Sequence, residues 1–470
     1  MDQNVSYEFG LVGLGVMGRN FILNVAEKGF SALGYDLDPE KVQALREEGD
    51  DFGNIDATTD LKTFVKGLSQ PRRIMMLVPA GKIVDDVIAG LRPALEEGDI
   101  LVDGGNSHFS DTDRRAAELS KSGIRYFGAG VSGGAEGARR GPSIMPGGPE
   151  SAYPELKPIF EAVAAQYQGA PCVAYLGPRS AGNYVKMVHN GIEYGLMQLT
   201  GEAYHVLASL GGLSNQDLSR VFDRWNRGRL QSYLVEISAA IFRTQDPMGP
   251  GQLIDAILDK AKQKGTGKWT SQNGMDLGIP VPTIDIAVTM RAISALKPMR
   301  MQADAAYEKP EPVSIPAGEL ENLCESALYF AFIMAYAQGL HQLSEASREY
   351  GYQLNIGQVA RIWRAGCIIR AALLEDIAKA YSEEPAPEHL ILSAHFIREI
   401  GPCLPAVRKL LNLSVRSGLP MPALSNSLAY FDAFTTGRLP LNLIQAQRDY
   451  FGAHTFERTD REGTFHADWE

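Results

Sequence analysis

The segment Lys186–Tyr194 (Lys-Met-Val-His-Asn-Gly-Ile-Glu-Tyr) concentrates side chains that can do chemistry. On a helix, positions i, i+3, i+4, i+7 and i+8 share one face. In this segment those positions are Lys186, His189, Asn190, Glu193 and Tyr194. Such a face can supply a general base, a general acid and donors that orient hydroxyl groups. A solvated polar face is the alternative, but solvated faces usually repeat Glu and Lys, so the pattern favours a catalytic face.

A glycine-rich loop near the N-terminus indicates a dinucleotide site. The run Gly13-Leu14-Gly15-Val16-Met17-Gly18 follows a strand-like segment and opens a helix-like one. In that context the glycines permit a tight turn, close approach of a pyrophosphate and close helix packing. The helix N-terminus adds amide donors and the positive end of a dipole. A plain glycine turn is the less favoured alternative.

The residue that ends the second predicted strand bears on the choice of cofactor. Asp36 lies 23 positions after Gly13, where a carboxylate can accept hydrogen bonds from the adenosine ribose hydroxyls. It would repel a 2′-phosphate, and the next four residues, Leu-Asp-Pro-Glu, supply no cation. The sequence therefore favours NAD over NADP, although Asp36 could also merely cap a turn.

The chain changes character near residue 180, which predicts how these sites are held. Before that point short apolar runs alternate with amphipathic segments, which is typical of a doubly wound parallel sheet. The predicted strands are Tyr7–Val12, Ala32–Asp36, Arg73–Val78, Ile100–Asp103 and Arg125–Gly128. We therefore expect a Rossmann-like α/β domain at 1–180, an all-helical domain at 181–435 and a C-terminal tail at 436–470 without a core of its own, which docks on the body or on a second subunit. A proline-rich stretch at Lys309–Pro316 should interrupt the helices.

A faint repeat suggests that the helical part is duplicated. The segment from Met197 to Gly228 resembles the one from Met334 to Gly366, and both end in Trp-x-x-Gly. At this offset of about 137 residues, the counterparts of Lys186, His189, Asn190 and Glu193 are Leu323, Ser326, Ala327 and Phe330. One copy is therefore expected to carry chemistry and the other to be packed. Chance similarity of amphipathic helices is the alternative.

Composition excludes several classes of function. The chain has 470 residues and a formal charge of −11, which argues against broad binding of nucleic acid or of anionic membranes. We expect no membrane span, because no stretch of about 18 apolar residues occurs. The four cysteines lack Cys-x-x-Cys spacing and the N-terminus does not read as a signal peptide, so we expect a reduced, cytoplasmic protein.

Taken together, the motifs resemble those of 6-phosphogluconate dehydrogenase, the decarboxylating enzyme of the pentose phosphate pathway. The resemblance runs nearly end to end and rests on GLGVMGRN, VDGGNS, VSGGAEGAR, KMVHNGIEY, KGTGKWT and QAQRDYFGAH, beginning at Gly13, Val102, Val131, Lys186, Lys264 and Gln445. It implies oxidative decarboxylation of 6-phospho-D-gluconate to D-ribulose 5-phosphate and CO2. It also implies a homodimer whose tail reaches into the partner subunit.

The resemblance also assigns roles to residues. It implies that Lys186 is the general base and Glu193 the general acid, and that no metal is required. It implies substrate contacts at Asn106, Ser132, Gly133, Gly134, His189, Asn190, Tyr194, Lys264, Thr266, Arg291, Arg448 and, from the other subunit, His454. Of these, Lys264, Arg291 and Arg448 would bind the phosphate. For the cofactor it implies the loop from Gly13 to Gly18, with Val78, Ala80 and Asn106.

Three positions depart from the pattern of many family members. Asp36-Leu37-Asp38 stands where they have Asn-Arg-Thr, and Pro79 stands where a Lys is often found. Both departures remove positive charge near the cofactor and strengthen the expectation of NAD. Ala135 replaces a Glu, and nothing in the sequence explains that change. Two alternatives remain: another β-hydroxyacid dehydrogenase, or a nucleotide-binding regulatory protein that has lost turnover.

Overall fold

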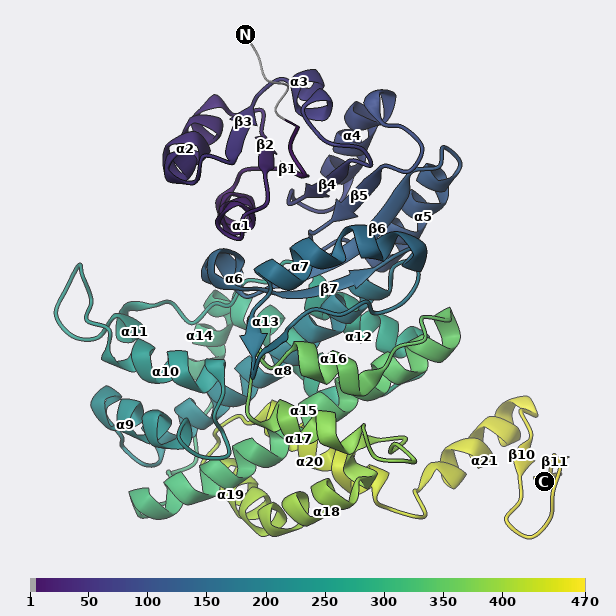
Figure 1. The fold of residues 1–470 in the computed structure, drawn as a ribbon. Coiled ribbons are helices and arrows are strands. Elements are labelled where there is room, and N and C mark those ends of the chain that lie inside the picture. Colours follow the sequence, from purple (N-terminus) through teal and green to yellow (C-terminus); the bar gives the residue numbers. More distant parts are fainter. Residues whose placement is uncertain (1–5, 470) are drawn as a thin grey trace.

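A computed structural model describes residues 6–469. Its N-terminal part is a seven-stranded sheet in the order β3-β2-β1-β4-β5-β6-β7, in which β1 to β6 are parallel and β7 pairs antiparallel with β6 (Figure 1). Its strands are β1 (Phe9–Val12), β2 (Ala32–Tyr35), β3 (Ile55–Thr58), β4 (Arg73–Met76), β5 (Ile100–Asp103), β6 (Arg125–Ser132) and β7 (Ser143–Gly147). Two-residue strands β8 (Gln166–Tyr167) and β9 (Ala170–Pro171) form a small hairpin after the sheet. The expected Rossmann-like fold is confirmed.

The two strands that the sequence did not reveal lie at the sheet's edges. β3 holds only one fully buried residue, Ala57, so it lacks a clear apolar pattern. β7 contains Pro146, which breaks a strand signal but is tolerated at an edge because no neighbour on that side needs its missing N–H. The expectation of a purely parallel sheet was therefore wrong for its last strand.

Helices cover both faces of the sheet. One hydrophobic cluster joins it to α1 (Val16–Glu27), α2 (Pro39–Gly49) and α7 (Lys157–Val163), and a second joins it to α3 (Leu61–Lys66), α4 (Lys82–Leu91) and α5 (Phe109–Ser120). Alternate strand residues point to opposite clusters: Met75 belongs to the first, and Ile74 and Met76 to the second. Parallel strands buried on both faces explain the continuous apolar runs.

From Ala181 to Phe434 the fold is helical. Two long helices, α8 (Ala181–Ser209) and α15 (Ala317–Tyr350), pack against each other at its centre (Figure 1). Alone among helices of residues 6–469, α15 is long and apolar enough to cross a membrane, but 83% of that stretch is buried in the protein, which identifies a core helix. The others are α9 (Asn215–Trp225), α10 (Tyr233–Arg243), α11 (Leu253–Ala256), α12 (Thr266–Asp276), α13 (Pro282–Ala295), α14 (Lys297–Ala306), α16 (Ile356–Ile362), α17 (Leu373–Ala380), α18 (Ala394–Ile400), α19 (Leu404–Arg416) and α20 (Pro422–Phe434).

The two halves of this region share local structure. The turn Gly278-Ile-Pro-Val-Pro282 leads from α12 into α13, and Gly418-Leu-Pro-Met-Pro422 leads from α19 into α20. Both glycines have left-handed φ values, +69° and +62°. Each half also supports the other: Glu202 of α8 accepts hydrogen bonds from the first amides of α20, and Gln338 of α15 accepts one from Thr283 at the start of α13. These features support a duplicated unit whose copies exchange helix caps.

The tail, residues 436–470, is more ordered than its composition suggested. It forms α21 (Leu441–Gly452) and a short antiparallel hairpin of β10 (Phe456–Glu457) and β11 (Thr464–Phe465). The carboxylate of buried Asp449 accepts hydrogen bonds from Thr455, His466, Ala467 and Trp469 and gathers the tail around itself. Among residues 436–469 no apolar side chain is buried, so the tail has no hydrophobic core, and this buried carboxylate organises it instead. Figure 1 shows the tail projecting away from the body.

Candidate active site

The polar face of α8 is buried and internally connected. Lys186 Nζ donates to Asn190 Oδ1 at 2.8 Å and lies 3.4 Å from His189 Nδ1, which in turn is 3.9 Å from a carboxylate oxygen of Glu193. Lys186 is 6% exposed and His189 is fully buried, whereas the Glu193 side chain is 21% exposed. The structure therefore brings together the residues that helical spacing had grouped, and it excludes the alternative of a solvated face.

A glycine on the neighbouring strand explains how a long amine fits so deep. At Gly130 of β6, a Cβ atom would lie 2.3 Å from Lys186 Cβ, a distance that real side chains do not show. Gly130 thus lets α8 approach the end of the sheet. This role could not be predicted from the sequence, because a glycine inside an apolar strand carries no pattern of its own.

Burial sets the protonation of the face. It lowers the pKa of Lys186, although Glu193 and Cys367 oppose the effect. It raises the pKa of Glu193, against the opposing charges of Lys186 and Arg291. Burial also lowers the pKa of His189 well below its usual value, and the charge of Lys186 adds to this effect. All three groups are therefore biased toward their neutral forms, as a lysine base and a carboxylic acid donor require.

Residues from the sheet complete this neighbourhood. Ser132, at the end of β6, places its Oγ 3.3 Å from His189 Nε2. Asn106, in the loop after β5, accepts a hydrogen bond from Asn190 Nδ2 at 3.3 Å. Gly133 and Gly134 follow at the start of α6 (Gly134–Arg140), and the backbone of Gly133 has φ +113°. Two loops at the carboxyl ends of strands thus face α8, and this edge of an open α/β sheet is where ligands bind.

Asn183 is a member of this neighbourhood that the sequence reading missed. Its side chain donates to the carbonyl of Gly105 at 3.2 Å and accepts from Thr112 Oγ1 at 2.9 Å. It lies three residues before Lys186, so the same helical spacing could have found it.

The cations expected to bind phosphate are dispersed. Half-buried Arg291 of α13 lies over the ring of Tyr194, 3.4 Å from its centroid, and so reaches the catalytic helix. Lys264 lies on an exposed loop, and buried Thr266 begins α12, which packs on α8. Arg448 and His454 do not join them. They are exposed on the tail, where Arg448 donates a hydrogen bond to Gln445 and His454 contacts the ring of Phe451 edge-on.

The glycine-rich loop has the shape that a dinucleotide needs. Gly13 has φ +96°, and a Cβ there would lie 2.7 Å from the carbonyl of Leu77. At Gly15, by contrast, a Cβ would meet nothing within 4 Å, and this residue caps α1 without any side-chain hydrogen bond. The loop thus leaves open space beside free amides at a helix N-terminus, where a pyrophosphate fits. Val78 and Ala80 follow β4 in the adjacent loop.

Asp36 caps the turn that follows β2, which was the alternative considered for it, and it also contacts the glycine loop. Its carboxylate accepts from the backbone N–H of Leu14 at 2.8 Å and of Asp38 at 3.0 Å, so it ties β2 to the glycine loop. The Nζ of Lys41 lies 3.5 Å from the Asp36 carboxylate and its side chain is 42% exposed; this residue directly follows the uncharged or acidic run Leu-Asp-Pro-Glu. A negative group at the ribose position is therefore present, and a partly exposed positive group lies beside it.

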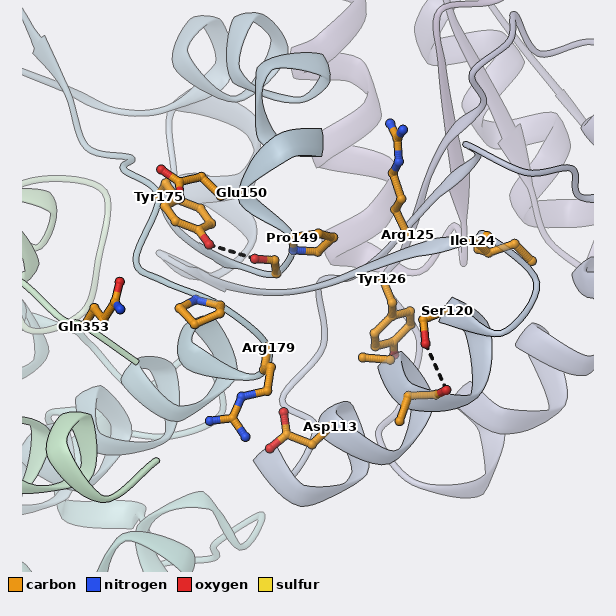
Figure 2. A pocket seen from close by; sticks show the side chains of 15 residues that line it. Asp113, Ser120, Ile124, Arg125, Tyr126, Pro149, Glu150, Tyr175, Arg179 and Gln353 are labelled. Atoms are coloured by element: carbon orange, nitrogen blue, oxygen red, sulfur yellow. Dashed lines mark hydrogen bonds between the residues drawn. The ribbon is translucent and has the colours of Figure 1, made fainter. Parts of the chain in front are cut away.

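A large cavity lies elsewhere. It measures about 630 Å3 and lies between α5, the start of β6 and the chain before α8 (Figure 2). Its walls include Asp113, Tyr126, Glu150, Tyr175 and Arg179, but none of the residues predicted for substrate or cofactor. In Figure 2 Arg125 points away from its interior. Size alone therefore does not identify the active site here.

Comparisons with known proteins agree with this geometry. Residues 8–177 match the family model of the NAD binding domain of 6-phosphogluconate dehydrogenase, and residues 182–469 match that of its C-terminal domain. The chain is 48% identical over 464 residues to the NADP(+)-dependent, decarboxylating 6-phosphogluconate dehydrogenase of Bacillus subtilis, covering 98% of this chain and 99% of the relative. A chloroplastic 6-phosphogluconate dehydrogenase of Arabidopsis thaliana is 46% identical, with coverage of 98% and 96%.

A solved structure extends the likeness to three dimensions. The Plasmodium falciparum 6-phosphogluconate dehydrogenase superposes with a TM-score of 0.95 at 43% identity, covering 98% of this chain and all of that one. That protein is described in its apo form and in complex with NADP+ and with 6-phosphogluconate. Fold, site geometry and matched length agree, and the chain belongs to the 6-phosphogluconate dehydrogenase family.

Proposed function

We propose that the protein catalyses oxidative decarboxylation of 6-phospho-D-gluconate to D-ribulose 5-phosphate and CO2, with reduction of a nicotinamide cofactor. The observation that carries the proposal is the pair of ionisable groups on one buried helix face, Lys186 and Glu193, whose pKa values are both shifted by burial toward the neutral forms. These forms suit a base for the first step and an acid for the last.

Each step has a residue to perform it. Neutral Lys186 takes the proton of the C3 hydroxyl as the hydrogen at C3 leaves as hydride. When bound, the nicotinamide supplies the hydride acceptor. As the resulting β-keto acid loses CO2, the Lys186 ammonium donates to the C3 oxygen, where negative charge develops. Protonated Glu193 then delivers a proton to C1 of the enediol. Asn190, which already contacts Lys186, can hold the amine in place through both steps.

We further propose that NAD is preferred over NADP. The partly buried Asp36 carboxylate, fixed to Leu14, would bind ribose hydroxyls and repel a 2′-phosphate. Lys41 could offset part of that repulsion, and the Bacillus relative is named as NADP(+)-dependent. Measuring kcat/KM with each cofactor decides the matter. A strong preference for NADP would contradict the proposal. In that case the Lys41→Ala substitution should weaken the preference for NADP.

The tail is proposed to complete the site of a partner subunit in a homodimer. Arg448 lies on α21 and His454 just after it, in the tail that projects from the body (Figure 1). This part of the tail exposes the apolar side chains of Leu439, Leu441, Leu443, Ile444, Tyr450 and Phe451. Such an apolar surface is usually covered. Together with Lys264 and Arg291, Arg448 would then bind the substrate phosphate; Arg suits its dianion through bidentate geometry.

Mixed dimers test this arrangement. Lys186→Met and Arg448→Ala proteins should each be impaired alone, the second through a raised KM. Coexpressed, they should regain a site of normal KM, which pairs Lys186 of one subunit with Arg448 of its partner. Absence of complementation in purified mixed dimers would contradict tail exchange.

The overall activity has a direct test. Reduced nicotinamide should accumulate when the protein is mixed with 6-phosphogluconate and NAD or NADP, and CO2 should be released in equal amount. A panel of unphosphorylated β-hydroxyacids should be turned over poorly; activity only on these, or on none, would support one of the two alternatives.

The four cysteines are buried and free, in keeping with a proposed cytoplasmic location.

A further inference from the structure

A buried charge network lies directly behind the loop that carries Asn106. Asp103, the last residue of β5, is 1% exposed, and its carboxylate is surrounded by donors. One oxygen accepts from the N–H of Gly105 at 3.0 Å. The other accepts from Ser107 Oγ at 2.6 Å and from Tyr126 at 3.1 Å. Residues on both sides of Asn106 are therefore bound to one carboxylate.

Arg115 of α5 extends the network to the next loop. Its side chain is 1% exposed, and Nη1 lies 3.5 Å from Asp103 and 3.3 Å from Ser107 Oγ. Its Nε and Nη2 donate to the two carboxylate oxygens of Asp85 at 2.8 and 3.1 Å, and Nη2 also donates to the carbonyl of Gly81 at 3.0 Å. One guanidinium thus joins the Asn106 loop to the loop that follows Val78 and Ala80.

The catalytic helix holds the same loop from the opposite side. The carbonyl of Gly105 accepts from Asn183, three residues before Lys186, while the N–H of Gly105 donates to Asp103. Asn106 itself contacts Asn190, the partner of Lys186. A shift of this loop would therefore be felt at the amine through a single intervening side chain.

We propose that Asp103 and Arg115 are positioning residues for the reaction, which hold the 104–107 loop and the 78–81 loop in register with each other and with α8. The inference rests on the proposed roles of Asn106, Val78 and Ala80 at substrate and cofactor. A burial this complete is costly for an ion pair and is not needed for stability, since apolar side chains could fill the space. Positioning gives it a purpose, because small misplacements of reacting groups slow catalysis strongly.

Asp103→Asn and Ser107→Ala test the proposal, with Asn106→Ala as the reference. Asp103→Asn replaces the central carboxylate by a neutral amide, and Ser107→Ala removes only one hydroxyl. Both should lower kcat at least roughly tenfold, in the direction of Asn106→Ala but less severely. Asp103→Asn should also raise the dissociation constant of reduced nicotinamide cofactor, measured by fluorescence titration without substrate. The matched control is Arg114→Ala: Arg114 also binds Asp85, but it is half exposed and does not contact the loop, so its kinetic constants should stay unchanged.

The outcomes separate cleanly. If Asp103→Asn and Ser107→Ala lower only the melting temperature and leave kcat, KM and cofactor affinity within about twofold of the parent, the network is structural and the proposal is wrong. If Asn106→Ala leaves all three constants unchanged, the role of Asn106 fails and takes this inference with it. If the parent does not turn over 6-phosphogluconate at all, the proposed function fails, and the cofactor titration still reports whether the loops are coupled.

Discussion

The helices α8 and α15 occupy comparable places in two similar halves, but only α8 buries lysine, histidine and glutamate side chains. At the positions that correspond to His189, Asn190 and Glu193, α15 has Ser326, Ala327 and Phe330. Ala327 and Phe330 are buried in the core, and Ser326 binds Arg229. The position corresponding to Lys186 holds Leu323, which packs against the same core. The difference shows that this scaffold does not itself require buried charge.

The comparison also shows what allows α8 to bury an amine. Burying an isolated charge is unfavourable unless it is paired or becomes neutral. On α8 burial shifts the pKa values of Lys186 and Glu193 toward their neutral forms, and Lys186 also donates a hydrogen bond to Asn190. On α15 nothing needs this arrangement, and ring packing such as that of Phe330 on Phe431 replaces it. Corresponding helix positions therefore carry reactive groups in one half and packed apolar side chains in the other.

Removing the amine should have the largest effect. Lys186→Met keeps the length of the side chain but deletes the base and the later ammonium. We expect kcat to fall by about 10³-fold or more, within the range for a general base. Cofactor affinity, measured by fluorescence, should stay near that of the parent because Lys186 makes no contact with the glycine loop. Near-normal turnover would show that another group is the base.

The matching change on α15 should affect stability instead. Phe330→Ala leaves a cavity in the core and should cost about 3–5 kcal/mol of unfolding free energy. Thermal melting should show a clear loss, while kcat and KM, measured well below the new melting temperature, should remain close to the parent values. A large fall in kcat with little change in melting temperature would mean that the halves are not specialised as described.

Glu193→Gln should produce a smaller and more selective defect. The amide keeps the shape but cannot donate the acid proton to C1. Overall turnover should fall by about 10²-fold. The first step should suffer less, so the initial burst of reduced cofactor should persist while ribulose 5-phosphate appears slowly. Equal slowing of both would assign Glu193 to the hydride step or to substrate binding.

Much of this could be predicted from the sequence because the relevant signals are local. Helical spacing placed Lys186 beside Asn190, and a strand–glycine–helix pattern located the loop at Gly13. What could not be predicted depends on contacts between distant segments. Gly130 matters only because α8 crosses it, and Arg115 looks like an ordinary helix-surface residue until the fold buries it between two loops.

The edge strands and the tail show the same limit. β7 was hidden by Pro146, whose effect depends on which side of the sheet has a neighbour. The order of the tail depends on Asp449, a single carboxylate that accepts hydrogen bonds from donors up to 20 residues away. The repeated Trp-x-x-Gly motif predicts the duplication. The repeated Gly-x-Pro-x-Pro turns are a stronger sequence signal for it, because five residues share one pattern.

The smallest expected effect concerns the caps that the halves exchange. Glu202 and Gln338 both hold the start of a helix in the other half, but only Glu202 can ionise. Burial raises its pKa from 4.5 to about 7, even though the amides of Ala423 and Leu424 oppose this shift. A folded-state pKa above the unfolded value means that protonated Glu202 favours folding. Its contribution is fully present below pH 4.5 and is lost as pH rises through about 7.

Glu202→Gln should remove this dependence. Between pH 4.5 and 7.5 the melting temperature of the variant should rise relative to that of the parent, by the equivalent of no more than about 3 kcal/mol. Gln338→Glu supplies the matched control, because it gives the other half the same titrating cap and should increase the loss of stability at high pH. If the difference in melting temperature between Glu202→Gln and the parent does not change with pH, the two amides of α20 hold Glu202 ionised throughout. The caps at Glu202 and Gln338 would then contribute equally to the pH dependence of stability.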